Sequence, residues 1–446
     1  MNDTRNLHLT DELIRAALTK EPPLGLAEVV GRGLTIRLDT TPQRRHGSIR
    51  WPSSDPLPRL EPWIERLRPR GLGLAVALAL LVLSSLMIAA VVGSLLPRRP
   101  APFGLAQPGL IAFDLDGDVF TMDRDGGGLR RLTSGAASDL APTWSLDGTM
   151  IAFGSVIPPE ANVWPPDSTV EVVVMRPDGT DRRTIATLSA NVSVYGNPYQ
   201  ESGRLAWSPD GRSIAYTALI GARPEIFVAP VDGTGAAQVG DPVLEGADPA
   251  WSPDGARIAF RGGSNDLDRG VYVMNRDGSG ARRLSTYVAG VSLYSYVRPT
   301  WSPNGHEIAF ARLMREEGLS AVWIVDVDTG LERMISPDDG DSQFPAWSPD
   351  GDRLAYMSYT SDTAQFVVVG ADGSDPVVLE PFAGWAPTWS PDGRHLVGRN
   401  DDDGDTATRL VIIDIATGTA MIVLGPPHDP TSDDPWGLPS WQRLAD

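Results

Sequence analysis

Cysteine is absent from this chain of 446 residues. Its absence excludes disulfides, zinc sites built on thiolates and a cysteine nucleophile. Lys20 is the only lysine although arginine is plentiful, a usage typical of bacteria with GC-rich genomes. Histidine is scarce as well, and its five positions show no metal-ligand spacing: His8, His46, His306, His395 and His428.

Catalytic motifs are also missing. The chain has no Gly-x-Ser-x-Gly elbow, no phosphate-binding P-loop and no dinucleotide-binding glycine fingerprint. We therefore expect a protein that is not an enzyme and has no cofactor.

Positive charge is scarce beyond the first hundred residues. Residues 1–99 carry a net charge of +5 and the remainder carries −24, which together give −19. Such an asymmetry predicts two compartments or two kinds of partner. The acidic part is expected to repel nucleic acid and to avoid lying flat on an anionic membrane.

Only one long hydrophobic run is present. Residues 71–96 contain no charged residue and would form a helix about 39 Å long, enough to cross a hydrocarbon core of about 30 Å. About 70 residues precede the run, so a cleaved signal peptide is not expected. Four arginines flank its N-terminal side and two its C-terminal side: Arg59, Arg66, Arg68 and Arg70 against Arg98 and Arg99. This imbalance predicts a single-pass cell-membrane protein with a cytoplasmic N-terminus and an exported C-terminal part.

The segment before the run divides into residues 1–39, with patterns for short helices, and a Pro/Arg-rich linker over 40–70. Two short helices cannot bury much apolar surface alone. The segment is therefore either a poorly ordered tail or one in which residues 1–40 fold on a cytoplasmic protein partner. The layout resembles that of transmembrane anti-sigma factors, although the zinc-binding His and Cys residues of many of those are missing.

The most informative pattern is a repeat of Trp-Ser-Pro-Asp-Gly. Six copies or near copies begin at tryptophans, and a truncated seventh lies near the C-terminus: Trp144, Trp207, Trp251, Trp301, Trp347, Trp389 and Trp441. Successive tryptophans are 63, 44, 50, 46, 42 and 52 residues apart. A period of about 40–50 residues with strand-type composition is typical of β-propeller blades.

Residues 249–286 serve as the type repeat. They predict a strand A ending in the motif, a Pro-Asp-Gly turn, strand B over 257–260, strand C over 271–274, a second Asp-Gly turn and strand D over 281–284. Seven such units occur, but the first lacks a strand A. The Trp441 segment can supply it and close the ring. We expect an all-β, seven-bladed propeller over 110–446, preceded by a Pro-rich linker over 97–109, one transmembrane α-helix and the short N-terminal tail.

The Trp-Ser-Pro-Asp-Gly motif resembles the repeat of TolB-type, WD-like propellers, and the likeness covers about three quarters of the chain. It implies that the motif residues are architectural, with tryptophans between blades and Asp-Gly in turns. Members of the family include periplasmic proteins that bind lipoprotein partners and propeller domains attached to peptidases. We expect this sequence to depart from both, with a membrane anchor, no separate N-terminal periplasmic domain and no room for a hydrolase domain.

The two families of Asp-Gly turns are expected on one face of the propeller, because A–B and C–D connections leave the ring on the same side. The longer B–C and D–A loops leave on the other side, where binding residues concentrate on such loops. Exposed aromatic residues and arginine are typical binding anchors. Our candidates for the binding site are Tyr195, Asn197, Tyr199, Tyr287, Tyr294, Tyr296, Arg298, Phe344, Trp385, His428 and Trp436. The alternative role for each is packing beneath the loops.

An acidic cluster in the last blade is a weak calcium candidate, with Asp401, Asp403 and Asp405 as the possible ligands. A solvated acidic loop is the simpler interpretation.

The sequence therefore favours a membrane-anchored propeller that binds an exported protein, peptide or glycan as a scaffold or sensor. One alternative is a propeller enzyme, lactonase-like or glycan-cleaving, with acidic residues meeting at the axis. Another is a transmembrane sensor whose cytoplasmic tail holds a transcription regulator.

Overall fold

The computed structural model describes residues 104–157, 169–188, 205–220, 223–241, 243–264, 268–286, 298–314, 319–337, 340–359, 364–379, 384–400, 409–424 and 439–444. The predicted N-terminal tail, juxtamembrane linker and transmembrane helix all lie outside these ranges. Within them, the protein forms no helix with the length and apolar character needed to span a membrane.

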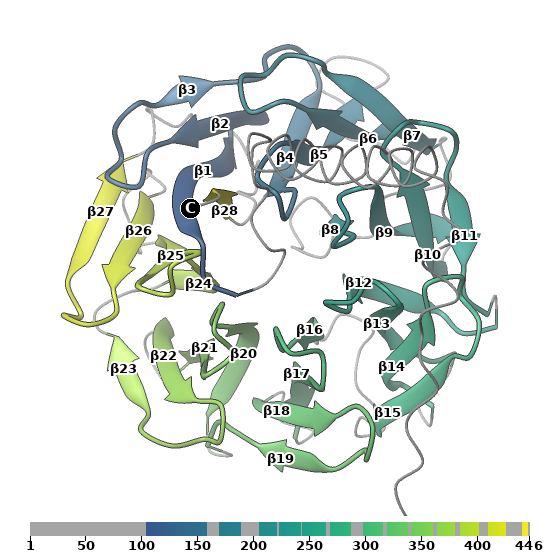
Figure 1. Ribbon diagram of the computed structural model, residues 1–446, viewed down its shortest axis with the longest axis vertical. Coiled ribbons are helices and arrows are strands. Elements are labelled where there is room, and N and C mark those ends of the chain that lie inside the picture. Colours follow the sequence, from purple (N-terminus) through teal and green to yellow (C-terminus); the bar gives the residue numbers. More distant parts are fainter. Residues whose placement is uncertain are drawn as a thin grey trace, which may run out of the picture. The chain divides into compact units, whose positions relative to one another are not determined.

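Seven four-stranded antiparallel sheets form the blades of a propeller (Figure 1). Blade 1 consists of β28 (Ser440–Leu444), β1 (Gln107–Leu115), β2 (Asp118–Met122) and β3 (Arg130–Arg131). Blade 2 consists of β4 (Ser138–Trp144), β5 (Ile151–Ile157), β6 (Thr169–Met175) and β7 (Arg183–Leu188). Blade 3 consists of β8 (Ala206–Trp207), β9 (Ser213–Ile220), β10 (Arg223–Pro230) and β11 (Ala237–Val239).

The remaining blades repeat this order. Blade 4 consists of β12 (Gly246–Trp251), β13 (Arg257–Gly262), β14 (Gly270–Asn275) and β15 (Arg282–Thr286). Blade 5 consists of β16 (Thr300–Trp301), β17 (Glu307–Leu313), β18 (Ser320–Asp326) and β19 (Glu332–Met334). Blade 6 consists of β20 (Asp341–Trp347), β21 (Arg353–Tyr359), β22 (Ala364–Gly370) and β23 (Val377–Leu379). Blade 7 consists of β24 (Gly384–Trp389), β25 (His395–Asn400), β26 (Arg409–Asp414) and β27 (Ala420–Leu424).

The predicted closure by the C-terminal strand is confirmed. β28 pairs with β1 in the register Ile111↔Trp441, so blade 1 joins two distant parts of the chain. β1 begins at Gln107, so residues 107–109, which were predicted to belong to the linker, are strand instead. These residues join the sheet because they pair with β28, with Gln107 opposite Leu444.

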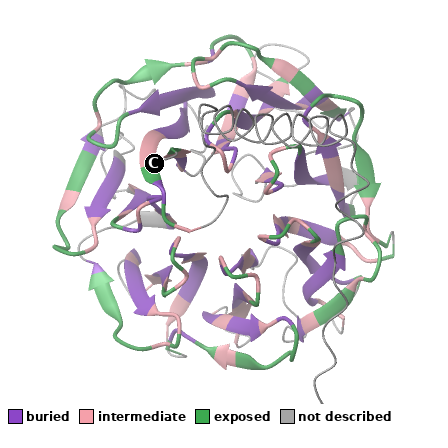
Figure 2. Ribbon diagram, viewed as in Figure 1, coloured by how far each residue is buried: buried purple, intermediate pink, exposed green. Residues whose placement is uncertain are grey.

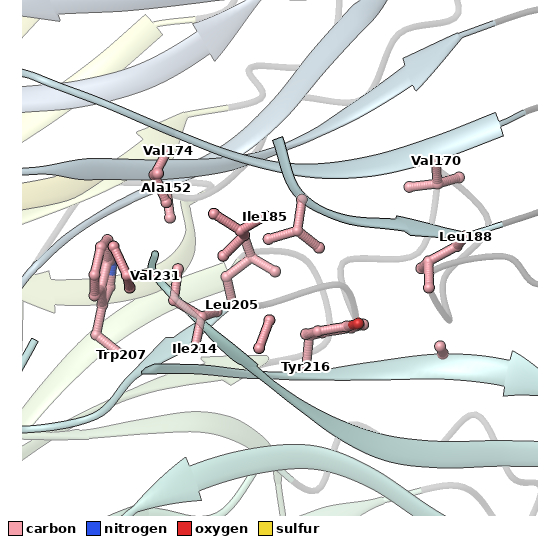
Figure 3. Packing of buried hydrophobic residues seen from close by; sticks show 13 residues of the cluster. Ala152, Val170, Val174, Ile185, Leu188, Leu205, Trp207, Ile214, Tyr216 and Val231 are labelled. Carbon is pink, nitrogen blue, oxygen red and sulfur yellow. The ribbon is translucent and has the colours of Figure 1, made fainter. Parts of the chain in front are cut away.

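The hydrophobic core lies between neighbouring blades. The Ile-Ala-Phe/Tyr segments of the B strands are buried, and each cluster draws residues from two adjacent sheets (Figure 2). Figure 3 shows one such cluster, in which Val174 and Ile185 of blade 2 face Trp207 and Tyr216 of blade 3. A blade is therefore stable only against its neighbours, which is why an open edge has to be closed.

The serine and aspartate of the motif build the A–B turn. In blade 4, the Ser252 hydroxyl donates to the carboxylate of Asp254 at 2.5 Å and accepts the N–H of Arg257 at 2.9 Å. Gly255 completes the turn with a φ of +68°, in the left-handed region that favours glycine. The same Ser–Asp or Ser–Asn contact recurs in blades 2 to 7.

The motif tryptophans link consecutive blades, as the family resemblance implied. In five of the seven, the indole N–H donates to the carbonyl of the residue just before the previous blade's tryptophan. Five such bonds of 2.9–3.3 Å are formed, by Trp207, Trp251, Trp301, Trp347 and Trp389. The series breaks on both sides of blade 1, where the indole nitrogens of Trp144 and Trp441 are buried without a hydrogen-bond partner.

Candidate binding face

The two faces of the propeller differ as predicted. A–B and C–D turns lie on one side, which we call the Asp-Gly face, and B–C and D–A connections lie on the other, the variable-loop face. The first described residues approach the Asp-Gly face, because the N–H of Ala106 donates to the carbonyl of Pro391 in the motif turn of blade 7 at 2.9 Å.

Buried polar side chains are concentrated toward the variable-loop face. They lie at the starts of A and C strands and in the final parts of B strands and D segments. The set comprises Asp114, Asp118, Thr133, Asp139, Ser155, Thr217, Glu225, Arg261, Ser285, Arg298, Ser320, Ser336, Ser342 and Gln343. Besides the motif serines, the other buried polar residues of the described ranges are Thr121, Ser213 and Gln442. Burying polar groups is costly, and a hydrophobic core does not require a layer of them. The layer therefore distinguishes the variable-loop face, as the specialised one, from the Asp-Gly face.

Two of the predicted site residues meet on this face. The guanidinium of Arg298 lies 4.9 Å from the ring centroid of Phe344, a cation–π contact between the A segments of blades 5 and 6. Both side chains are buried, at 9% and 3% exposure. For Trp385 the structure gives the strand position, opposite Arg399, and nothing of the side chain. The other eight candidates lie outside the described residues: Tyr195, Asn197, Tyr199, Tyr287, Tyr294, Tyr296, His428 and Trp436.

Arg298 and Phe344 occupy a strained backbone position that recurs around the ring. The residue three before the motif tryptophan has a positive φ in five blades, at Ala141, Asp248, Arg298, Phe344 and Ala386. Each of these residues precedes a proline, and the register of the A and B strands shifts at this point in blades 2, 4, 6 and 7. A β-bulge of this kind re-aims side chains, and strain of this kind concentrates at functional sites.

Ion pairs stiffen the same strand ends. Asp248 pairs with Arg261 at 3.0 Å, with both side chains 9% exposed. Asp139 is bound through both carboxylate oxygens by Arg182, at 3.1 and 3.2 Å. Sequence reasoning missed these residues because each is unremarkable alone. The available signal was their fixed offset from the motif tryptophan, three residues for Asp248 and five for Asp139.

Two carboxyl groups of this layer have perturbed acidity. Burial raises the pKa of Asp118 above its usual value, although its partner Arg131 acts in the opposite direction. Burial likewise raises the pKa of Glu225, against the lowering effect of Arg223. Both belong to the starts of C strands and were not predicted.

No group of three or more His, Asp or Glu suited to a metal ion occurs among the residues that the structure describes. The weak calcium candidate of Asp401, Asp403 and Asp405 lies outside them.

Comparison with known proteins bears on the repeat itself. Residues 286–423 match the family model described as the TolB beta propeller domain. The propeller is of the TolB type. Over 79 residues the chain is 38% identical to the Tol-Pal system protein TolB of Zymomonas mobilis, a match that covers 18% of this chain and 16% of that protein.

The chain is also similar to a peptidase in sequence and to a lyase in fold. The chain is 28% identical over 123 residues to the uncharacterized peptidase YuxL of Bacillus subtilis, which covers 26% of this chain and 19% of that protein. The crystal structure of oligogalacturonate lyase from Vibrio parahaemolyticus aligns with a TM-score of 0.51 at 13% identity, over 72% of this chain and 90% of that one. The matched segments span less than a fifth of the length of these two sequence relatives, TolB and the peptidase, and the structural likeness concerns the fold alone.

Proposed function

We propose that this TolB-type propeller is a binding module, and that it takes a protein or peptide on its variable-loop face rather than acting as an enzyme. The observation that carries the proposal is the layer of buried polar groups toward that face, in which Arg298 stacks on Phe344 at strained positions of adjacent blades. Both side chains are buried, so they pack beneath the loops and hold the loop ends in place, and the loops present the binding residues. The TolB relative is named as part of the Tol-Pal system, which supports a protein partner here.

A photo-crosslinking experiment in cells tests the proposed face. The crosslinking amino acid replaces Ile157 or Ile220, which end B strands on the variable-loop face and are 39% and 46% exposed. The matched controls are Leu129 and Leu331, beside C–D turns on the Asp-Gly face and 44% and 72% exposed. We expect one shared protein adduct from the first pair and none from the second. Adducts only from Leu129 and Leu331 would contradict the assignment.

We further propose that residues 71–96 anchor the protein in the cell membrane, with the propeller on the exported side. The uncharged run and the arginines before it support this orientation. The approach of Ala106 to blade 7 would then turn the Asp-Gly face to the membrane and the variable-loop face away from it. Externally added protease should degrade the propeller of intact spheroplasts. Protection of the propeller until the membrane is lysed would refute the orientation.

Whether the N-terminal segment binds a cytoplasmic partner distinguishes a sensor from a scaffold. Full-length protein and a version lacking residues 2–58 are crosslinked in cells and purified side by side. A cytoplasmic partner captured only by the full-length chain would indicate a sensor that couples outside binding to the inside. Capture of the same exported partners by both versions, and nothing cytoplasmic, would indicate a scaffold.

A further inference from the structure

Each of the seven sheets ends in an outer strand that pairs on one side only. These strands are β3, β7, β11, β15, β19, β23 and β27, and Figure 1 shows them at the rim of the ring. The open edge of such a strand presents backbone N–H and C=O groups that can pair with another chain. Natural proteins protect these edges by shortness, charge, proline or a β-bulge, so an edge without protection is expected to have a partner.

Six of the seven outer strands are protected. Four of them, β3, β11, β19 and β23, are only two or three residues long. The other two, β7 and β15, are longer, but each begins with an arginine and each pairs with a shift in register. These features discourage pairing with a further strand.

β27 has none of these protections. It extends over five residues, Ala420–Leu424, and pairs with β26 in an unbroken register. It lies within a run of thirteen uncharged residues, 415–427, although residues 100–446 carry a net charge of −24. The side chains of Met421 and Ile422 are 39% and 49% exposed. Among the strands that the structure describes, β27 is therefore the outer strand most open to pairing.

Blade 7 also departs from its own repeat at Met421. Met421 and Arg333 of blade 5 each lie three residues after the glycine of the same type of C–D turn. Blades 1, 2 and 4 have an arginine at the equivalent position as well. All four arginines donate to a backbone carbonyl in or beside the C–D turn of the next blade: Arg130 to Asp178, Arg183 to Val231, Arg282 to Val327 and Arg333 to Ala371. Methionine cannot make this bond, and it leaves the edge of β27 uncharged.

The hydrogen bonds between β26 and β27 determine which backbone groups of β27 face outward. The N–H of Asp414 donates to the carbonyl of Thr419 at 2.9 Å, and hydrogen-bonded pairs alternate along an antiparallel ladder. In the register of these strands, Met421 and Val423 therefore bond to β26. The three alternate residues centred on Ile422 direct their N–H and C=O groups to the open edge.

We propose that the partner of this edge is β27 of a second copy of the chain, paired antiparallel about a two-fold axis that passes through Ile422. Each Ile422 then bonds to its counterpart, and Ala420 and Leu424 bond to each other across the axis, which gives about six hydrogen bonds. An identical strand is itself uncharged, whereas the propeller as a whole is acidic and two copies repel each other elsewhere.

The pair is expected to be weak in dilute solution. Five residues from each copy bury far less than the roughly 1,200–2,000 Å² of a stable interface. The membrane anchor proposed above would raise the local concentration of the chain and favour pairing. The contact lies at the rim of blade 7, so it does not depend on the function proposed for the variable-loop face.

A single introduced thiol tests the contact, because the chain has no cysteine. Cells that express full-length Ile422→Cys are treated with a short, membrane-permeant bis-maleimide. Residues opposite each other in an antiparallel pair have Cβ atoms about 4.5–5.5 Å apart, within reach of this reagent. We expect a crosslinked product of twice the mass of the chain.

Met334→Cys is the matched control, because Met334 lies in the outer strand of blade 5 and is 39% exposed. It should give no product of doubled mass. Equal yields from the two variants would indicate random collision and would overturn the proposal. No product from Ile422→Cys, or a product with a different protein, would overturn it as well.

A second substitution separates pairing from folding. Met421→Arg introduces the residue that blades 1, 2, 4 and 5 carry at this position, so the fold accommodates it. In the proposed pair the two substituted side chains lie diagonally across the axis, about 7–8 Å apart, where like charges repel. Added to Ile422→Cys, it should reduce the crosslinked product at least about tenfold and leave the Tm unchanged. An unchanged yield would contradict pairing through β27.

Discussion

Trp207 donates its indole N–H to the carbonyl of Thr143 across the interface between blades 3 and 2, at 3.1 Å. Four further tryptophans repeat this bond, so six blades from 2 to 7 are linked in series. Blade 1, which contains both β1 and β28, lacks the bond on both sides, since the indoles of Trp144 and Trp441 have no partner. The ring therefore has a seam at the blade made from two ends of the propeller.

The seam predicts a difference between two equivalent tryptophan substitutions. Trp207→Phe removes a bonded indole and leaves the Thr143 carbonyl without its donor, whereas Trp144→Phe removes an N–H that has no acceptor. Both lose similar packing, because the two residues are 6% and 4% exposed. Trp207→Phe should cost about 1 kcal/mol more in the free energy of unfolding, measured by urea denaturation. Equal losses would mean that the indole bonds contribute nothing net.

Replacing a glycine at the seam should cost more stability than replacing the glycine at the equivalent position of another blade. Gly148 and Gly211 hold the same motif position, with φ of +67° and +66°. A Cβ on Gly148 would lie 2.0 Å from the carbonyl oxygen of Arg443 in β28, while one on Gly211 would meet nothing within 4 Å. Gly148→Ala should therefore cost at least about 1 kcal/mol more than Gly211→Ala. Thermal unfolding of the two variants measures this, and a smaller loss for Gly148→Ala would show that β28 shifts freely.

Removing one buried hydroxyl should not destabilise the protein. The hydroxyl of Tyr216 is buried without a partner (Figure 3), and burial raises the pKa of Tyr216 to about 12. Tyr216→Phe should leave stability unchanged or raise it by up to about 1 kcal/mol, because the unpaired group is lost. Tyr272 is the matched contrast, since its hydroxyl donates to the carbonyl of Asp268 at 2.6 Å. Tyr272→Phe should cost about 1 kcal/mol in the same assay.

Acidification should destabilise the propeller through its turns. In the C–D turns, hydrogen bonds from Ser or Thr two residues on lower the pKa of Asp178, Asp232, Asp277 and Asp372 from the usual value of 3.8. A lowered folded-state pKa gives stability that is present above 3.8 and is lost as the pH falls through the folded-state value. The temperature at the midpoint of thermal unfolding should accordingly decrease as the pH is lowered from about 5 to about 3.

Two substitutions with opposite expected effects on the pH dependence of stability test this explanation. Asp277→Asn should flatten the fall in the unfolding midpoint, because it removes one group whose pKa is lowered. Asp118→Asn should steepen it, because the raised pKa of Asp118 gives a contribution that grows on acidification and is lost as the pH rises. The same slope in both variants would contradict the assignment.

The repeat made most of the fold predictable. Trp441, alone at the end without a turn after it, was enough to predict a shared first blade, because the Ile111 segment lacked a strand A. The start of β1 was misplaced by three residues, since Pro108 and Gly109 are typical of a linker and only the contact with β28 makes them strand.

The candidate site was less predictable, because it depends on contacts between blades. Arg298 and Phe344 were chosen singly for their chemistry, and nothing in the sequence showed that they stack. The strained φ before each proline arises from a β-bulge in the A strands, which strand periodicity does not reveal.

The bond between Leu110 and Gln442 spans 332 positions of the chain. The ribosome therefore synthesises strands β1 to β27 before it adds β28, the strand that closes the ring. Until then the sheet edge of β1 stays open, and contacts of such long sequence separation form slowly. A chain truncated before Ser440 therefore keeps the edge of β1 unpaired, and an exposed strand edge favours aggregation and degradation.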